Sequence, residues 1–240
     1  MRALVAQTRA ELVLTMRRGE SLLLIVGIPA LLLGFFASVD VLPKGDFPDA
    51  ITYLAPGVLA LAVMSTGMVQ LAIGTSFERQ YGVLKRLGST PLGRPRLLGA
   101  KTLSILAVEG VQVVVLVALA LVLGWDPSVR AGVIAAVLLG TLAFSGLGLL
   151  MAGTLKGEVT LAAANGLYLV LLLLGGMVVP LSELPAGLRA VAELLPAAAL
   201  AEALIGTLSA GRTVPGKAWI VLAAWAVIGP TLASRFFRWD

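Results

Sequence analysis

The sequence has no cysteine and no histidine among its 240 residues, and only 13% of the residues are charged. The lack of cysteine excludes disulfides and thiolate metal sites. The lack of histidine removes the commonest general base and metal ligand. A membrane-embedded enzyme needs an acid–base or metal constellation, and no such cluster is visible, so we expect no catalytic, cofactor or metal site. Because 59% of the residues are hydrophobic, we expect most of the chain to lie in lipid.

Long apolar runs divide the chain into six expected membrane spans. Five of them are near the length that crosses the hydrocarbon layer, and the sixth is shorter. The preceding segment, 1–20, holds four arginines and is expected to form an interfacial helix; a short basic tail that only sets the topology is the alternative. We therefore predict an all-α polytopic membrane protein with a single transmembrane domain, residues 1–240. The expected spans are residues 21–39, 53–74, 103–123, 131–153, 159–179 and 218–232.

The basic residues are distributed unevenly along this topology. Most of the eighteen Lys and Arg lie in the N-terminal segment, in 77–101, in the turn at 154–158 and near the C-terminus. The positive-inside rule then places these segments and both termini in the cytoplasm. We interpret the net charge of +5 as this orientation signal, so we expect the lipid bilayer and no nucleic acid as a partner.

Proline residues mark an unusual segment between the fifth and sixth spans, at 180–217. Pro196 separates two apolar stretches, 186–195 and 197–208, which are helical in propensity but too short to cross a membrane. We predict an outer re-entrant or interface-lying helical pair; a loosely structured loop is the alternative. Residues 211–217 also fit the pattern G-x-x-x-x-G-K, but Ala218 follows and no strand precedes. The chain is therefore not expected to hydrolyse ATP itself.

A few polar residues lie inside the expected spans. Glu109 is the only acid or base deep in a span, and Gln112 shares its helix face. Gln70 on the neighbouring span lies at a similar depth, so we predict a Gln70–Glu109 hydrogen bond. Glu109 is either part of a substrate or proton path or an interhelical clamp. Asn165 is a further polar residue of this kind, and Gly146 and Gly148 permit close helix packing.

The stretch 77–101 holds basic residues between two apolar runs. Phe77, Tyr81, Leu84 and Leu87 recur at helical spacing, which predicts an amphipathic helix over 77–87 that ends at Gly88. A second helix is expected to begin near Thr90 and Pro91 and to lead into the third span. Such a surface helix can dock in a groove of a partner or bind anionic lipid.

This stretch resembles the cytoplasmic segment of type-2 ABC exporter permeases, which reads roughly E, G-x-L, L-x-x-T-P-L and a Lys that opens the third span. The matching residues are Glu78, Gly82, Leu84, Leu87, Thr90, Pro91, Leu92 and Lys101. In that family the segment contains a coupling helix that seats in a separate ATPase subunit. The resemblance therefore implies that the coupling residues are Glu78, Arg79, Tyr81, Gly82, Leu84, Lys85, Arg86, Leu87, Thr90 and Pro91.

The resemblance also implies a location in a bacterial cell membrane, together with partners and a cargo. Two copies of an ATPase subunit would bind ATP and Mg, and this chain would bind no cofactor. A second permease copy or a paralogous permease would complete the transporter, with the second and fifth spans around the path. The expected cargo is lipophilic or amphipathic, such as a drug, an antibiotic or a lipid-like molecule. The alternative function is an ion- or proton-coupled secondary transporter that uses Glu109.

Overall fold

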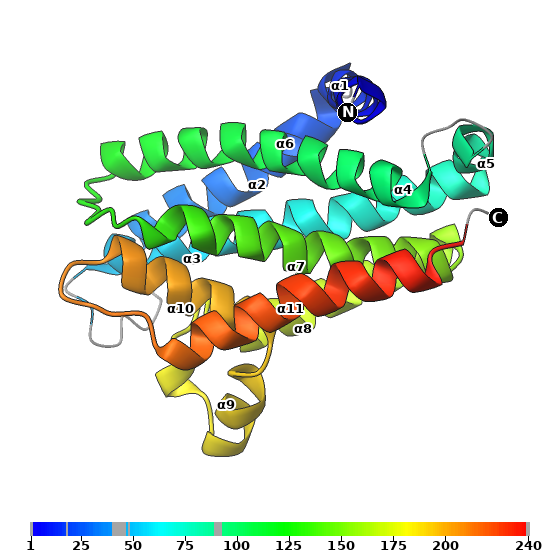
Figure 1. Cartoon of the computed structure of the whole chain (residues 1–240). Helices are drawn as coiled ribbons and strands as arrows, with labels where there is room; N and C mark the ends of the chain where they lie inside the picture. Colours follow the sequence, from blue (N-terminus) through cyan, green and yellow to red (C-terminus); the bar gives the residue numbers. More distant parts are fainter. Residues whose placement is uncertain (1, 18, 40–46, 48, 89–92, 239–240) are drawn as a thin grey trace.

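The computed structural model describes residues 2–17, 19–39, 47, 49–88 and 93–238, and every regular element within these residues is a helix. In chain order the elements are α1 (Arg2–Arg17), α2 (Gly19–Ser38), α3 (Ala50–Met64), the π-helix η1 (Ser65–Gln70), α4 (Leu71–Gln80), α5 (Val83–Gly88), α6 (Arg94–Val122), α7 (Gly132–Thr154), α8 (Gly157–Leu174), the 3₁₀-helix η2 (Leu181–Glu183), α9 (Ala186–Ala192), α10 (Pro196–Leu208) and α11 (Gly216–Phe236) (Figure 1).

The long helices correspond to the expected spans. Within the described residues, α2 covers the first expected span, and its described apolar part, Ile25–Ser38, is shorter than the others. The expected all-α polytopic fold is confirmed, while the extent of each membrane crossing stays a prediction. The other five expected spans fall on segments that are long and apolar enough to cross a membrane: Ala50–Gln80, Pro95–Val122, Gly132–Thr154, Gly157–Leu174 and Gly216–Phe236.

The N-terminal helix lies across the bundle. Figure 1 shows α1 nearly end-on, whereas α6, α7 and α11 run from side to side across the picture. α1 packs on α6, where a Cβ at Gly99 would lie 3.6 Å from Leu4 Cδ1. This crosswise direction agrees with the interfacial helix expected for residues 1–20.

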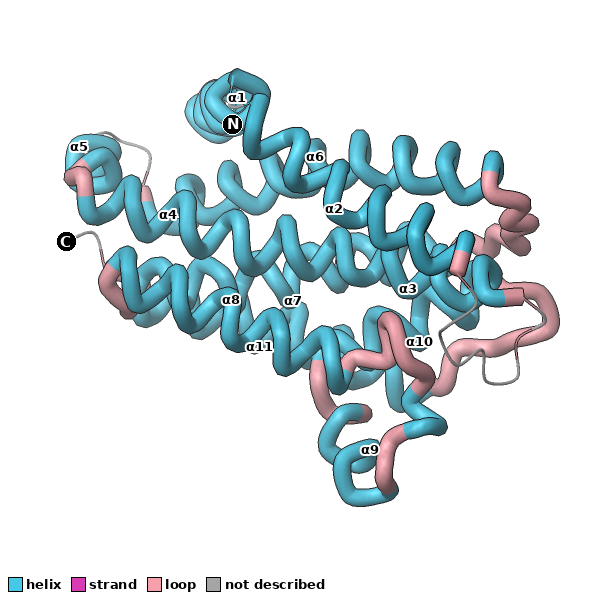
Figure 2. The backbone as a smooth tube through the Cα atoms, turned by 180° about the vertical axis from the view of Figure 1, so that it is seen from behind, coloured by secondary structure: helices cyan, strands magenta, loops and turns pink. Residues whose placement is uncertain are grey.

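The centre of the bundle is α3, whose side chains are almost all buried. It packs against α2, α6, α7 and α10, and the main hydrophobic core forms around it. Small residues allow this density: a Cβ at Gly57 would lie only 2.0 Å from the carbonyl oxygen of Met177, which follows α8. Figure 2 shows from behind that α5 and the C-terminus share one end of the bundle; we call it the α5 end.

A π-helical turn, η1, joins α3 to α4 within one continuous helix. The glycines expected to permit close packing lie beside this helix and α11. A Cβ at Gly148 would lie 2.7 Å from the carbonyl oxygen of Met68 in η1, and a Cβ at Gly146 would lie 2.5 Å from Pro230 Cδ. The prediction of close helix approach through small residues in α7 is therefore confirmed.

The proline-rich segment forms two short helices, as expected, and α9 and α10 meet at an angle of 86°. Their apolar faces have different surroundings. Ala201 and Leu204 of α10 are buried in the main core, whereas Leu188 and Val191 of α9 are exposed. In Figure 1, α9 projects from the bundle.

Candidate functional site

The segment between α4 and α6 does not form the single helix that we predicted over residues 77–87. α4 ends at Gln80, and α5 begins at Val83. The break lies at Gly82, whose φ of 72° is in the left-handed region that favours glycine. The prediction of one continuous helix is thus wrong because Gly82 ends α4. α5 is described as far as Gly88, and the next residues are outside the described part of the chain, so the helix end expected at Gly88 stays a prediction. The helix start predicted at Thr90 and Pro91 also lies outside the described residues.

α5 is anchored on a small hydrophobic cluster of its own. Leu84 is 0% exposed, and Leu87 packs against the edge of the same cluster. The cluster also takes side chains from α4, α6, α7 and α11, so it holds α5 to the rest of the bundle. Leu84 and Leu87 therefore position α5 and present little surface to a partner. The buried members are Leu71, Leu84, Leu97, Leu98, Ile105, Leu149, Ala233 and Phe237.

The outward side of the same segment is exposed. Tyr81 is 73% exposed, and Val83, Lys85 and Arg86 are also exposed. The Tyr81 ring stacks on Phe77 with 6.2 Å between the ring centroids, which orders the turn between the two helices. We call Tyr81, Val83, Lys85 and Arg86 the coupling face. It combines aromatic and aliphatic surface with basic side chains at the α5 end.

Glu78 and Arg79 stand apart from the coupling face and hold the tip of α4 to its neighbours. Glu78 Oε2 accepts a hydrogen bond from Lys101 Nζ of α6 at 2.6 Å. The Arg79 guanidinium donates to the carbonyl oxygens of Ala152 at 2.8 Å and Leu155 at 2.6 Å. These carbonyls lie at the C-terminal end of α7, where a cation interacts favourably with the helix dipole. The two residues therefore connect the tip of α4 to α6 and α7.

Two of the predicted intramembrane polar residues, Glu109 and Gln112, belong to a buried polar cluster inside the chain. Thr141 of α7 donates to Glu109 Oε2, and Glu109 is 0% exposed. Gln112 accepts from Thr66 of η1 at 3.1 Å and donates to the Ile25 carbonyl oxygen of α2 at 2.7 Å. The cluster thus joins α2, η1, α6 and α7.

The predicted hydrogen bond between Gln70 and Glu109 is wrong. Glu109 pairs with Thr141, and within the described residues Gln70 Oε1 has no hydrogen-bond partner. In η1 it is Gly67 that lies beside Glu109, since a Cβ there would lie 3.4 Å from Glu109 Oε1. Position along a helix also does not determine which way a side chain points. Asn165 lies elsewhere, on the exposed side of α8, and donates to its own helix at the Leu161 carbonyl oxygen.

Two functional candidates were missed by sequence reasoning. Thr141 is one of two hydroxyl residues in the fourth expected span, with Ser145, and nothing in the sequence singles it out. Glu11 lies 3.1 Å from Lys101 Nζ, and it is the only acid within Arg2–Arg17. An acid in an otherwise basic interfacial helix is a signal that could have directed attention to it.

Comparisons with known proteins agree with this arrangement. The family model described as ABC-2 type transporter matches residues 2–208, which run from α1 to the end of α10 and include the coupling face. A search of curated proteins found no match. The match covers most of the chain, and the helices are long and apolar enough to cross a membrane several times. This chain therefore belongs to the ABC-2 type transporter family, as a multi-pass membrane component of an ABC transporter.

Proposed function

We propose that this chain is the permease subunit of an ATP-driven exporter. Membership of the ABC-2 family implies in general a partner ABC ATPase subunit. In our proposal two copies of that subunit bind ATP and Mg, and this chain binds no cofactor and does not hydrolyse ATP itself. The permease pairs with a second copy or with a paralogous permease. Transport runs outward across a bacterial cell membrane.

The coupling face is the observation that carries this proposal. Leu84 packs short α5 onto the bundle, while Tyr81 and Lys85 are exposed. A short anchored helix with an exposed aromatic residue and basic side chains is suited to a groove on a protein partner. The segment joins α4 to α6, so a displacement of the coupling face by a partner can be transmitted to both helices. This geometry is explained without a catalytic site.

The distribution of charge supports a cytoplasmic position for the coupling face. Lys85, Arg86, Lys156 and Arg235 are exposed at or near the helix ends on the side of the bundle that holds α5. By the positive-inside rule this end faces the cytoplasm, which is also where ATP is available. Both termini then lie on the cytoplasmic side.

The surface of the long helices supports a lipophilic or amphipathic cargo. Large apolar side chains are exposed along α6, α8 and α11, and Asn165 is a polar group among them on α8. A path bordered by such surface suits a drug, an antibiotic or a lipid-like molecule better than a small ion, which needs rings of charged or carbonyl groups.

Purification with its ATPase subunit tests the proposal. Phosphate release from ATP should depend on the presence of this chain in lipid vesicles. We expect Tyr81→Ala and Lys85→Gln to weaken assembly about tenfold, since interface aromatics and charged contacts often contribute more than 1 kcal/mol each. The matched control is Lys217→Gln, which removes an exposed lysine near the beginning of α11. ATP hydrolysis that is indifferent to the wild-type chain would contradict the proposal.

A further inference from the structure

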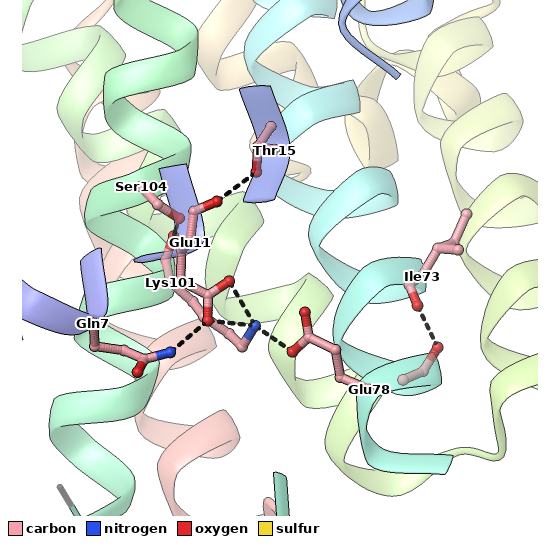
Figure 3. A network of polar contacts seen from close by, with 8 residues as sticks. Gln7, Glu11, Thr15, Ile73, Glu78, Lys101 and Ser104 are labelled. Atoms are coloured by element: carbon pink, nitrogen blue, oxygen red, sulfur yellow. Dashed lines mark hydrogen bonds and ion pairs between the residues drawn. The ribbon is translucent and has the colours of Figure 1, made fainter. Parts of the chain in front are cut away.

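Two carboxylates from different helices share one buried ammonium group. Lys101 of α6 is 2% exposed, and its Nζ lies 2.6 Å from Glu78 Oε2 of α4. The same Nζ lies 3.1 Å from Glu11 Oε1 and 3.2 Å from Glu11 Oε2 of α1. Figure 3 shows Glu11 and Glu78 approaching Lys101 from opposite sides. α1, α4 and α6 are thus joined at one point.

Glu11 is held in place independently of Glu78. Gln7 Nε2 donates to Glu11 Oε1 at 2.9 Å, and both residues belong to α1. α1 in turn packs along α6, where Leu4 lies beside Gly99. The contact between Glu11 and Lys101 is therefore part of a longer contact between two helices, whereas Glu78 approaches from the tip of α4.

The ratio of two carboxylates to one amine has a physical consequence. A buried ion pair that loses one partner leaves an uncompensated charge in a poorly hydrated place, which is strongly unfavourable. If Glu78 were the only partner of Lys101, any separation of the α4 tip from α6 would leave the buried ammonium group without a counter-charge. With Glu11 also present, Lys101 stays neutralised when Glu78 departs.

The position of Glu78 identifies the contact that moves. Glu78 lies just before the turn at Tyr81 and Gly82, so a displacement of the coupling face reaches it first. We propose, on the basis of the proposed function, that Glu11 is a positioning residue that keeps Lys101 neutralised while the tip of α4 moves relative to α6. α1 and α6 then move as one unit.

ATP hydrolysis by the complete complex in lipid vesicles tests the role of Glu11 without knowledge of the cargo. We expect Glu11→Gln to lower kcat for phosphate release about tenfold, with the KM for ATP and assembly unchanged. Glu11→Asp, which retains the charge, should recover part of the rate. The matched control is Glu158→Gln, an exposed acid in the first turn of α8, which should stay within about twofold of wild type.

Two further variants separate this role from a purely structural one. In a Lys101→Gln background there is no ammonium to neutralise, so adding Glu11→Gln should have no further effect on kcat. Cysteines at Leu4 and Gly99, joined by a short thiol cross-linker, should leave kcat unchanged because α1 and α6 are expected to stay together. The chain has no native cysteine to interfere.

The outcomes distinguish this inference from the proposed function. A wild-type chain without influence on ATP hydrolysis would overturn the proposed function and this role with it. If the wild-type chain does couple, a kcat of Glu11→Gln equal to that of Glu158→Gln would overturn only the role of Glu11. A Leu4–Gly99 cross-link that stops ATP hydrolysis would also overturn the role of Glu11. Because the cross-linked variant keeps every charged residue, this test remains valid even if Glu11→Gln does not fold.

Discussion

Glu109 and Lys101 are both fully buried ionisable residues of α6, but their surroundings differ. Lys101 has two carboxylate partners on other helices, whereas Glu109 has the hydroxyl of Thr141. Beside Glu109, η1 comes so close that a Cβ at Gly67 would lie 3.4 Å from Glu109 Oε1. A carboxyl group enclosed between helices of one chain is better suited to hold them together than to border a path.

Substitution of Glu109 should therefore affect stability more than activity. Glu109→Gln has nearly the same shape and keeps an acceptor for Thr141, so we expect ATP hydrolysis by the complex within about twofold of wild type. Glu109→Ala removes the contact between α6 and α7 and leaves the Thr141 hydroxyl only the Val137 carbonyl oxygen of its own helix. The free energy of unfolding should therefore fall by about 1–3 kcal/mol. Thermal unfolding of the purified chain measures this difference. Loss of activity in Glu109→Gln with unchanged stability would instead indicate a role for the charge.

At the scale of elements, the α4–α5 turn shows what the sequence could and could not predict. The spacing of Leu84 and Leu87 correctly predicted an apolar side on a surface helix. The same spacing did not reveal the break at Gly82, because a residue in the left-handed region interrupts a helix without changing the spacing of the apolar residues around it. The places of the long helices followed from apolar runs, but their lengths did not, since α6 already begins at Arg94 and α11 runs on to Phe236. The direction of a side chain such as Gln70 depends on how its helix is rotated about its own axis, and this rotation cannot be predicted from the amino-acid composition of the span.

Cysteine cross-linking tests the orientation of α5. A single cysteine at Tyr81, which is 73% exposed, should react with a cross-linker and join the chain to its ATPase subunit. A cysteine at Leu84, which is 0% exposed, should react at most about one tenth as fast, because a thiol reacts as the accessible thiolate. Lys217→Cys controls for an exposed site at the far end of the bundle. Equal cross-linking from positions 81 and 84 would mean that α5 turns its buried side toward the partner.

At the scale of the whole molecule, the uneven charge gives the bundle a direction. The turn between α7 and α8 contains exposed Lys156 at the α5 end. The connection between α6 and α7 lies at the opposite end and contains exposed Val129. Each connection holds one basic residue, Lys156 or Arg130, so these two loops alone give no bias. Lys85, Arg86 and Arg235 also lie at the α5 end, and by the positive-inside rule we therefore expect that end to face the cytoplasm.

Labelling of intact cells tests this direction. A membrane-impermeant maleimide should modify Val129→Cys, whereas Lys156→Cys should be modified only after the membrane is opened. We expect at least a tenfold difference in labelling, which corresponds to an orientation bias of about 1.4 kcal/mol or more. The cysteine-free wild-type chain gives the background. The reverse pattern would place α5 outside the cell and contradict the proposed contact with an ATPase.

The π-helical turn η1 also sets the rotational phase of everything that follows it. Hydrogen bonding from residue i to i+5 takes up about one residue more than an α-helical turn, and each α-helical residue advances by about 100°. The extra residue therefore rotates Glu78 and Arg79 toward Lys101 and the end of α7. When a relative with a purely α-helical second span is aligned with this chain, the gap belongs within Ser65–Gln70. A gap placed in the later loop would pair residues from different helix faces along all of α4.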